Sequence, residues 1–226
     1  MSGAPTRVAG IDCGTNSIRL LIADVDAGGA LVDRVRRMEV VRLGQGIDRT
    51  GVIAPDAMER TLAMTREYAA LCREHGVTAV RFVATSASRD ARNAGVFVEG
   101  VRAAFGDLDV VPEVVEGIVE AELSFTGATG GLRAADVPGP YVVVDLGGGS
   151  TELVRGTAHV EAAYSMDIGS VRMPERHLHD DPPTADQVAA ARADVRAALD
   201  VAERGVRLDG VGAVVALRHQ LEAQRR

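Results

Sequence analysis

Two segments of the chain, 133 residues apart, carry the same pattern of an acid, a glycine and a serine between apolar runs. Residues 9–21 read AGIDCGTNSIRLL and residues 142–154 read VVVDLGGGSTELV. Asp12 aligns with Asp145, and the glycine two positions later and the serine five positions later also match. A repeat at this spacing is too long for a solenoid. It therefore predicts two related domains.

Each copy of the pattern is typical of a strand, a tight polar turn and a second strand. Glycines in such a turn expose backbone N–H groups, and a concavity of N–H groups attracts an anion such as phosphate. Two copies that face a cleft would hold a phosphate chain from both sides. The alternative is a pair of ordinary hairpins with acidic turns, which does not account for the acid, glycine and serine occurring twice in register.

Strands and helices alternate along the remaining sequence, which favours an α/β fold with crossover helices. Pro55 predicts the first turn of a helix that extends to about Cys72. A second strong helix is expected from the cap Thr184 to Gly205. A shorter helix is expected over 119–126. The Gly- and Pro-rich residues 128–140 are interpreted as the domain junction.

Composition excludes several classes of protein. All 25 basic residues are arginines, so a P-loop lysine, a protein-kinase lysine and Schiff-base chemistry are excluded. A net charge of −7 argues against a DNA-binding face. The sequence contains neither a membrane-spanning apolar run nor the apolar core of a signal peptide, so we expect a cytoplasmic protein without a membrane partner.

The paired turns, together with FVATSASRDARN at 82–93 and VVEGIVEAELSFTG at 114–127, resemble four motifs of the exopolyphosphatase and guanosine pentaphosphate phosphohydrolase family. This resemblance covers about residues 7–205. It implies two ribonuclease-H-like domains of the actin-like ATPase superfamily that face a cleft. We expect the first domain over 1–130, with its phosphate loop at 12–17. The second is expected over 141–226, with its phosphate loop at 145–152.

The resemblance also implies roles for individual residues. Asp145 and Glu152 would hold Mg²⁺ or another divalent cation, which takes one or two carboxylates and fills its remaining positions with water and phosphate oxygens. Glu120 would be the base for the attacking water. The phosphate-binding residues would be Asp12, Gly14, Thr15, Asn16, Ser17, Arg89, Gly147, Gly148, Gly149 and Ser150.

The chain departs from the family pattern in two places. In the family, the base is preceded by a second acid, but this chain has Val119 there, after Ile118 at the variable position. Glu116 occupies a position where the family usually has a serine. In addition, the family's second domain normally continues through a further glycine turn, a long helix and a closing strand. We therefore expect the second domain to be truncated at its C-terminal end, without the strand and helix that close it.

The resemblance implies an enzyme that hydrolyses the terminal phosphoanhydride of inorganic polyphosphate. Guanosine pentaphosphate is the alternative substrate for the same chemistry. A third alternative is a catalytically impaired remnant that binds polyphosphate or a nucleotide, because the second domain is expected to be incomplete. An ATP-dependent kinase is less favoured, because the adenosine pocket of such kinases lies in the region expected to be missing. An exposed sheet face would also favour a homodimer.

Overall fold

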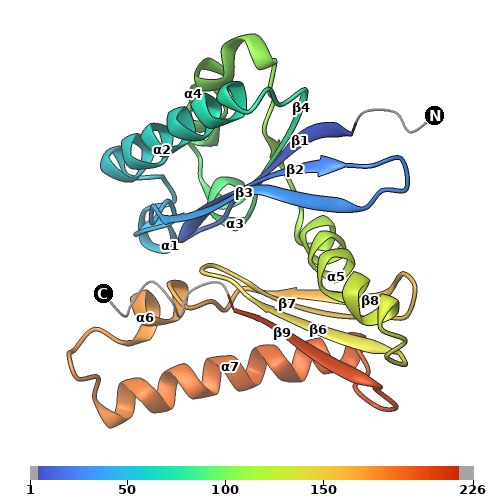
Figure 1. Ribbon diagram of the computed structural model, residues 1–226. Helices are drawn as coiled ribbons and strands as arrows, with labels where there is room; N and C mark the ends of the chain where they lie inside the picture. The colour runs from blue at the N-terminus through green and yellow to red at the C-terminus, as the bar shows by residue number, and fades with distance from the viewer. Residues whose placement is uncertain (1–4, 219–226) are drawn as a thin grey trace. The chain divides into compact units, whose positions relative to one another are not determined.

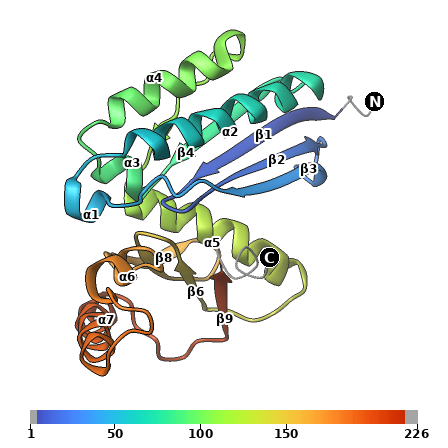
Figure 2. The ribbon, with the colours of Figure 1, turned by 90° about the vertical axis from the view of Figure 1, so that its left-hand side faces the viewer.

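The computed structural model describes residues 5–218, and the chain divides into two compact units, Met1–Val115 and Glu116–Arg226 (Figures 1 and 2). This boundary lies before the helix that contains Glu120, whereas the expected first domain extended to residue 130. None of the described helices is both long and apolar enough to cross a membrane.

The first unit is built on a five-stranded sheet with the strand order β3-β2-β1-β4-β5. Strand β1 pairs antiparallel with β2 and parallel with β4. The strands are β1 (Thr6–Cys13), β2 (Ser17–Val25), β3 (Leu31–Val40), β4 (Ala79–Ala84) and β5 (Glu113–Val114). The helices are α1 (Ile47–Thr50), α2 (Pro55–Glu74), α3 (Ser86–Asp90), α4 (Ala94–Phe105) and a 3₁₀ turn at Gly106–Leu108.

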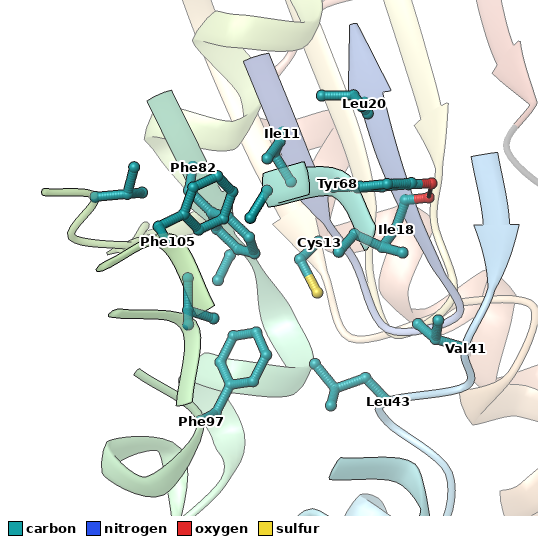
Figure 3. Packing of buried hydrophobic residues seen from close by; sticks show 14 of the residues in the cluster. Ile11, Cys13, Ile18, Leu20, Val41, Leu43, Tyr68, Phe82, Phe97 and Phe105 are labelled. Atoms are coloured by element: carbon teal, nitrogen blue, oxygen red, sulfur yellow. Dashed lines mark hydrogen bonds between the residues drawn. The ribbon is translucent and has the colours of Figure 1, made fainter. Parts of the chain in front are cut away.

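The core of the first unit lies between the sheet and helices α2 and α4 (Figure 3). Phe82 of β4 contacts Phe97 and Phe105 of α4 edge to face, with ring centroids 6.2 Å apart in both pairs. Tyr68 of α2 is buried and donates a hydrogen bond to the carbonyl of Ile18. Strand β1 lies beside β4 in a parallel ladder, so the C-terminal ends of both strands lie at one edge of the sheet.

The second unit is built on a four-stranded sheet with the strand order β8-β7-β6-β9. Its strands are β6 (Tyr141–Leu146), β7 (Thr151–Gly156), β8 (Val160–Met166) and β9 (Ala213–Arg218). Its helices are α5 (Gly117–Ala134), α6 (Arg172–His177) and α7 (Ala185–Gly205). The predicted cap of α7 is present, because Thr184 and Gln187 bond reciprocally as a capping box.

Helices α5 and α7 cover opposite faces of the second sheet (Figure 2). Alternate residues of β6 point to the two sides, as the pleat of a strand requires. Tyr141 and Val143 pack with Phe125 of α5, while Val142 packs with Ala202 of α7. Asp145 continues the first of these rows and therefore lies on the α5 side.

The two units repeat one topology. Strands β8, β7, β6 and β9 have the order and directions of β3, β2, β1 and β4. Helix α7 connects β8 to β9, with the short α6 before it, just as α2 connects β3 to β4 after α1. The expected α/β class with two ribonuclease-H-like units is therefore confirmed, and the repeat extends well beyond the two turns.

One sequence prediction for the second unit was wrong. Residues 128–134 are the last two turns of α5 rather than a junction, because Ala128 and Leu132 pack against the sheet and override the weak helix propensity of the glycines. The second sheet also contains β9, which is parallel to β6 and equivalent to β4, and among the described residues this sheet has no counterpart of β5. Gly212 lets the chain enter β9 beside Pro138, since a Cβ at that position would collide with the Pro138 carbonyl.

Candidate active site

The two aligned turns form the same backbone hydrogen bond. The N–H of Gly14 donates to the carbonyl of Ser17 at 2.9 Å, and the N–H of Gly147 donates to the carbonyl of Ser150 at 3.0 Å. Among the described residues, the N–H groups of Thr15 and Gly148 make no backbone hydrogen bond within these turns. The same holds for Asn16 and Gly149, the next residue of each turn. Each turn thus has two adjacent N–H groups of the kind that bind anions.

Buried hydroxyl groups support the first turn. The hydroxyl groups of Thr15 and Ser86 lie 2.8 Å apart, and both side chains are buried. Ser86 opens α3 directly after β4, where the N–H of Thr85 donates to the carbonyl of Cys13. Burial raises the pKa of the Cys13 thiol, as does the Asp12 charge, so this cysteine is a protonated core residue and not a nucleophile.

Arg89 also belongs to this edge of the first sheet. It lies in the last turn of α3, three residues after Ser86, and its Nη1 donates to the carbonyl of Val115 at 2.7 Å. The structure therefore places Arg89 and the first turn at the C-terminal ends of the neighbouring parallel strands β4 and β1.

The second turn is held by the loop that follows β8. The carbonyl of Gly147 accepts from Ser170, and the carbonyl of Gly148 accepts from the N–H groups of Val171 and Arg172. Gly169 packs directly on Gly148, where a Cβ would collide with the backbone. The carbonyl groups of this turn are therefore engaged by the protein.

The acid before each turn has a different partner in the two units. In the first unit Asp12 lies opposite Arg19 across the hairpin and forms an ion pair with it at 3.0 Å. In the second unit Asp145 lies opposite Glu152, and both side chains are buried, at 5% and 1% exposure. The second hairpin thus places two carboxylates side by side on the α5 face of its sheet.

Serine hydroxyl groups contact these two carboxylates. Ser124 of α5 donates to Oδ2 of Asp145, and Ser165 of β8 donates to Oε1 of Glu152 at 2.8 Å. The sequence did not indicate either serine. Ser165 meets Glu152 through the register of β8 on β7, and Ser124 meets Asp145 through the packing of α5 on the sheet.

Glu120 lies on the first turn of α5, four residues before Ser124, and is half-buried. Residues four apart share a helix face. Glu120, the expected base, therefore lies on the face of α5 from which Ser124 contacts Asp145. Both expected metal ligands belong to the same unit as Glu120. The described residues contain no cluster of three or more histidine, cysteine or acidic side chains suited to a metal.

Comparisons with known proteins identify the family of this chain. A model of the Ppx/GppA phosphatase family matches residues 21–224. Exopolyphosphatase 2 of Mycobacterium tuberculosis is 53% identical over 211 residues, which cover 91% of this chain and 66% of that protein. A bifunctional 3-dehydroquinate synthase/phosphatase of Fusobacterium nucleatum is 32% identical over 175 residues, which cover 74% of this chain and 26% of that protein.

Solved structures give the same result. The crystal structure of an exopolyphosphatase-like protein matches with a TM-score of 0.89 and 48% identity, covering 96% of this chain and 67% of the other. An Aquifex aeolicus member of the Ppx/GppA family matches with a TM-score of 0.72 and 33% identity, covering 95% of this chain and 66% of the other. The chain belongs to the Ppx/GppA phosphatase family. It spans about two-thirds of the length of Exopolyphosphatase 2.

Proposed function

We propose that the protein hydrolyses the terminal phosphoanhydride of inorganic polyphosphate. Its family and its 53% identity to a protein named Exopolyphosphatase 2 support this activity. The observation that carries the proposal is the second unit's pair of buried carboxylates, which lies beside the glycine turn and under the helix that carries Glu120.

Substrate binding is assigned to the two turns and to Arg89. The adjacent N–H groups of each turn donate to phosphate oxygens without a counter-charge of their own. Arg89 adds a planar guanidinium, which can donate two parallel bonds to one phosphate. The net charge of −7 makes such local donors necessary, because the overall charge repels a polyanion.

Asp145 and Glu152 fit a divalent cation such as Mg²⁺. Two carboxylates are what Mg²⁺ usually takes from a protein, and water and phosphate oxygens supply the remaining ligands. A bound cation would offset the charge that the phosphoryl oxygens carry during the displacement.

Glu120 is proposed as the general base. Its carboxylate would accept a proton from the attacking water, while the turns hold the terminal phosphoryl group for in-line attack. A correctly placed base typically contributes about 10²- to 10⁴-fold in rate. No covalent enzyme intermediate is needed, because water attacks the terminal phosphorus directly, the shortened polyphosphate chain leaves, and the attacked group is released as phosphate.

The test is phosphate release from long-chain polyphosphate with Mg²⁺, by the wild type and by two variants of one helix. Glu120→Gln should lower turnover at least about 10²-fold with nearly unchanged polyphosphate binding. Glu122→Gln removes an exposed carboxylate of α5 and should leave the rate unchanged. Equal rates for Glu120→Gln and Glu122→Gln would refute the base assignment.

The same assay separates the alternatives. A higher kcat/KM for guanosine pentaphosphate than for polyphosphate would assign the chain to the second substrate of this chemistry. Binding of polyphosphate without turnover would identify a catalytically impaired binder. The cytoplasmic location and the homodimer stay predictions, which fractionation of cells and light scattering would test.

A further inference from the structure

The carboxylates of Asp145 and Glu152 each accept a hydrogen bond from a serine on a neighbouring element. Ser124 of α5 bonds to Asp145, and Ser165 of β8 bonds to Glu152 at 2.8 Å. Asp145, Glu152 and Ser165 are direct partners across β6, β7 and β8, so they form one row on the α5 face of the sheet. Ser124 reaches the end of this row from the helix that covers it.

A serine hydroxyl has one proton to donate and carries no charge. Donation to one carboxylate oxygen fixes the orientation of the acid without neutralising it. The aligned position of the first hairpin shows the opposite arrangement, because Arg19 neutralises Asp12 there. The serines therefore suit a pair of acids whose negative charge is required for a bound cation.

The same two serines hold helix α5 on the sheet. Gly117, three residues before Glu120, packs so closely on Ser165 that a Cβ on the glycine would lie 2.8 Å from the Ser165 Cβ. Ser124 lies one helical turn after Glu120 and bonds to Asp145. The contacts on both sides of Glu120 thus join the helix of the expected base to the strands of the expected metal ligands.

We propose that Ser124 and Ser165 are positioning residues of the metal site. They hold the two carboxylates in the orientation that binds the cation. They also fix the position of α5 on the sheet, which places Glu120 near the cation. This inference rests on the proposed function, because the cation is part of that proposal. Outer partners of metal ligands are typically worth about 10- to 100-fold in metal affinity.

The experiment measures Mn²⁺ binding to the whole chain by calorimetry for the wild type, Ser124→Ala, Ser165→Ala and Thr126→Ala. Thr126 is an exposed residue of α5 and serves as the matched control. Each serine variant should bind Mn²⁺ about 10- to 100-fold more weakly than the wild type, while Thr126→Ala binds as the wild type does. In urea, each serine variant should unfold at a lower midpoint than Thr126→Ala, because it loses a hydrogen bond to a buried carboxylate.

Unchanged Mn²⁺ affinity in both serine variants would overturn the proposal, and so would a wild type that binds no Mn²⁺. A lower urea midpoint with unchanged affinity would show that the serines are merely structural. The steady-state assay adds a second readout, because a serine variant should regain most of the wild-type rate when the Mg²⁺ concentration is raised about 100-fold.

Failure of the proposed function would give a different result. If the serine variants lose Mn²⁺ affinity but the wild type releases no phosphate from polyphosphate, the positioning role stands and the proposed activity falls. If the wild type hydrolyses polyphosphate and both serine variants match it in Mn²⁺ affinity, the activity stands and the positioning role falls.

Discussion

In the first unit the aspartate before the turn lies opposite an arginine, whereas in the second unit the aligned aspartate lies opposite a glutamate. Asp12 and Arg19 neutralise each other in an ion pair, and the side chain of Asp12 is 48% exposed. Asp145 and Glu152 are both acidic, and both are buried. Two copies of one topology have therefore acquired different charges at the same hairpin position.

The difference indicates a division of labour between the units. The first unit contributes a turn with N–H donors and, through Arg89, a positive charge, which suits phosphate binding. The second unit contributes a turn of the same kind together with two acids and Glu120, which suits a cation and proton transfer. Under the proposed function, a shared fold would allow one unit to bind substrate while the other unit also carries the chemistry.

The largest expected effect is the loss of one acid of the second hairpin. Glu152→Gln keeps the shape of the side chain but removes a charge from the proposed cation site. Turnover of polyphosphate should fall by about 10³-fold, because a bound cation contributes several kcal/mol to such a transition state. Phosphate release at a fixed Mg²⁺ concentration measures this effect.

The matched change in the first hairpin is Arg19→Gln, which removes the charge at the aligned position. Its ion pair with Asp12 is partly exposed, and such pairs are worth about 0–1 kcal/mol of stability. We therefore expect a rate close to that of the wild type. If Arg19→Gln costs as much turnover as Glu152→Gln, the two hairpins do not differ in the way proposed.

Arg89→Ala tests the phosphate-binding role of the first unit. It should weaken polyphosphate binding by about 1.5–3 kcal/mol, as expected for a hydrogen bond to a charged group. Mn²⁺ affinity should stay constant, because the proposed metal ligands belong to the other unit. Calorimetry with polyphosphate and with Mn²⁺ gives both values.

The control for this variant is Arg102→Ala, which removes an arginine of α4 that forms an exposed ion pair with Glu99. Arg89 also bonds to the Val115 carbonyl, so urea unfolding must accompany the binding data. A change in unfolding free energy without a change in polyphosphate affinity would make Arg89 a structural residue.

The aligned glycines of the two turns should differ in their tolerance of a side chain. A Cβ at Gly147 would lie 2.9 Å from the Ser150 carbonyl oxygen, whereas a Cβ at Gly14 would lie 3.6 Å from the Ser17 oxygen. Gly147→Ala should therefore lower the unfolding free energy by about 1–3 kcal/mol, as overpacking does. Gly14→Ala should cost less, and urea unfolding that ranks the pair in the reverse order would refute this difference.

The smallest expected effect concerns acid stability of the first unit. Asp24 bonds to Arg7 and Arg34, and these arginines lower its pKa from 3.8 to about 2. A lowered pKa in the folded state stabilises the protein above the unfolded pKa, and this contribution is lost as the pH falls from about 4 towards 2. The difference in unfolding free energy between the wild type and Asp24→Asn should shrink over this range. A constant difference would contradict the assignment.

The sequence predicted the features that depend on local patterns. The paired turns, the helix that begins at Pro55 and the capped helix after Thr184 follow from glycine positions, caps and apolar periodicity, and the structure contains all of them. The position of Asp145 and Glu152 on either side of the second turn also made their pairing foreseeable.

Features that depend on packing were missed. Gly130 and Gly131 suggested a junction, but Leu132 packs on the sheet and keeps the helix intact. Ser124 and Ser165 carry no local signal, because serines occur in every kind of structure and only the fold brings these two to the acids.

The most direct test of the division between the units compares Mn²⁺ binding by Asp12→Asn and Asp145→Asn, the same substitution at the aligned positions of the two hairpins. Calorimetry should show wild-type Mn²⁺ affinity for Asp12→Asn and a loss of at least about 10-fold for Asp145→Asn, because only the second aspartate has an acid rather than an arginine beside it. Equal Mn²⁺ affinities for the two variants would contradict the account.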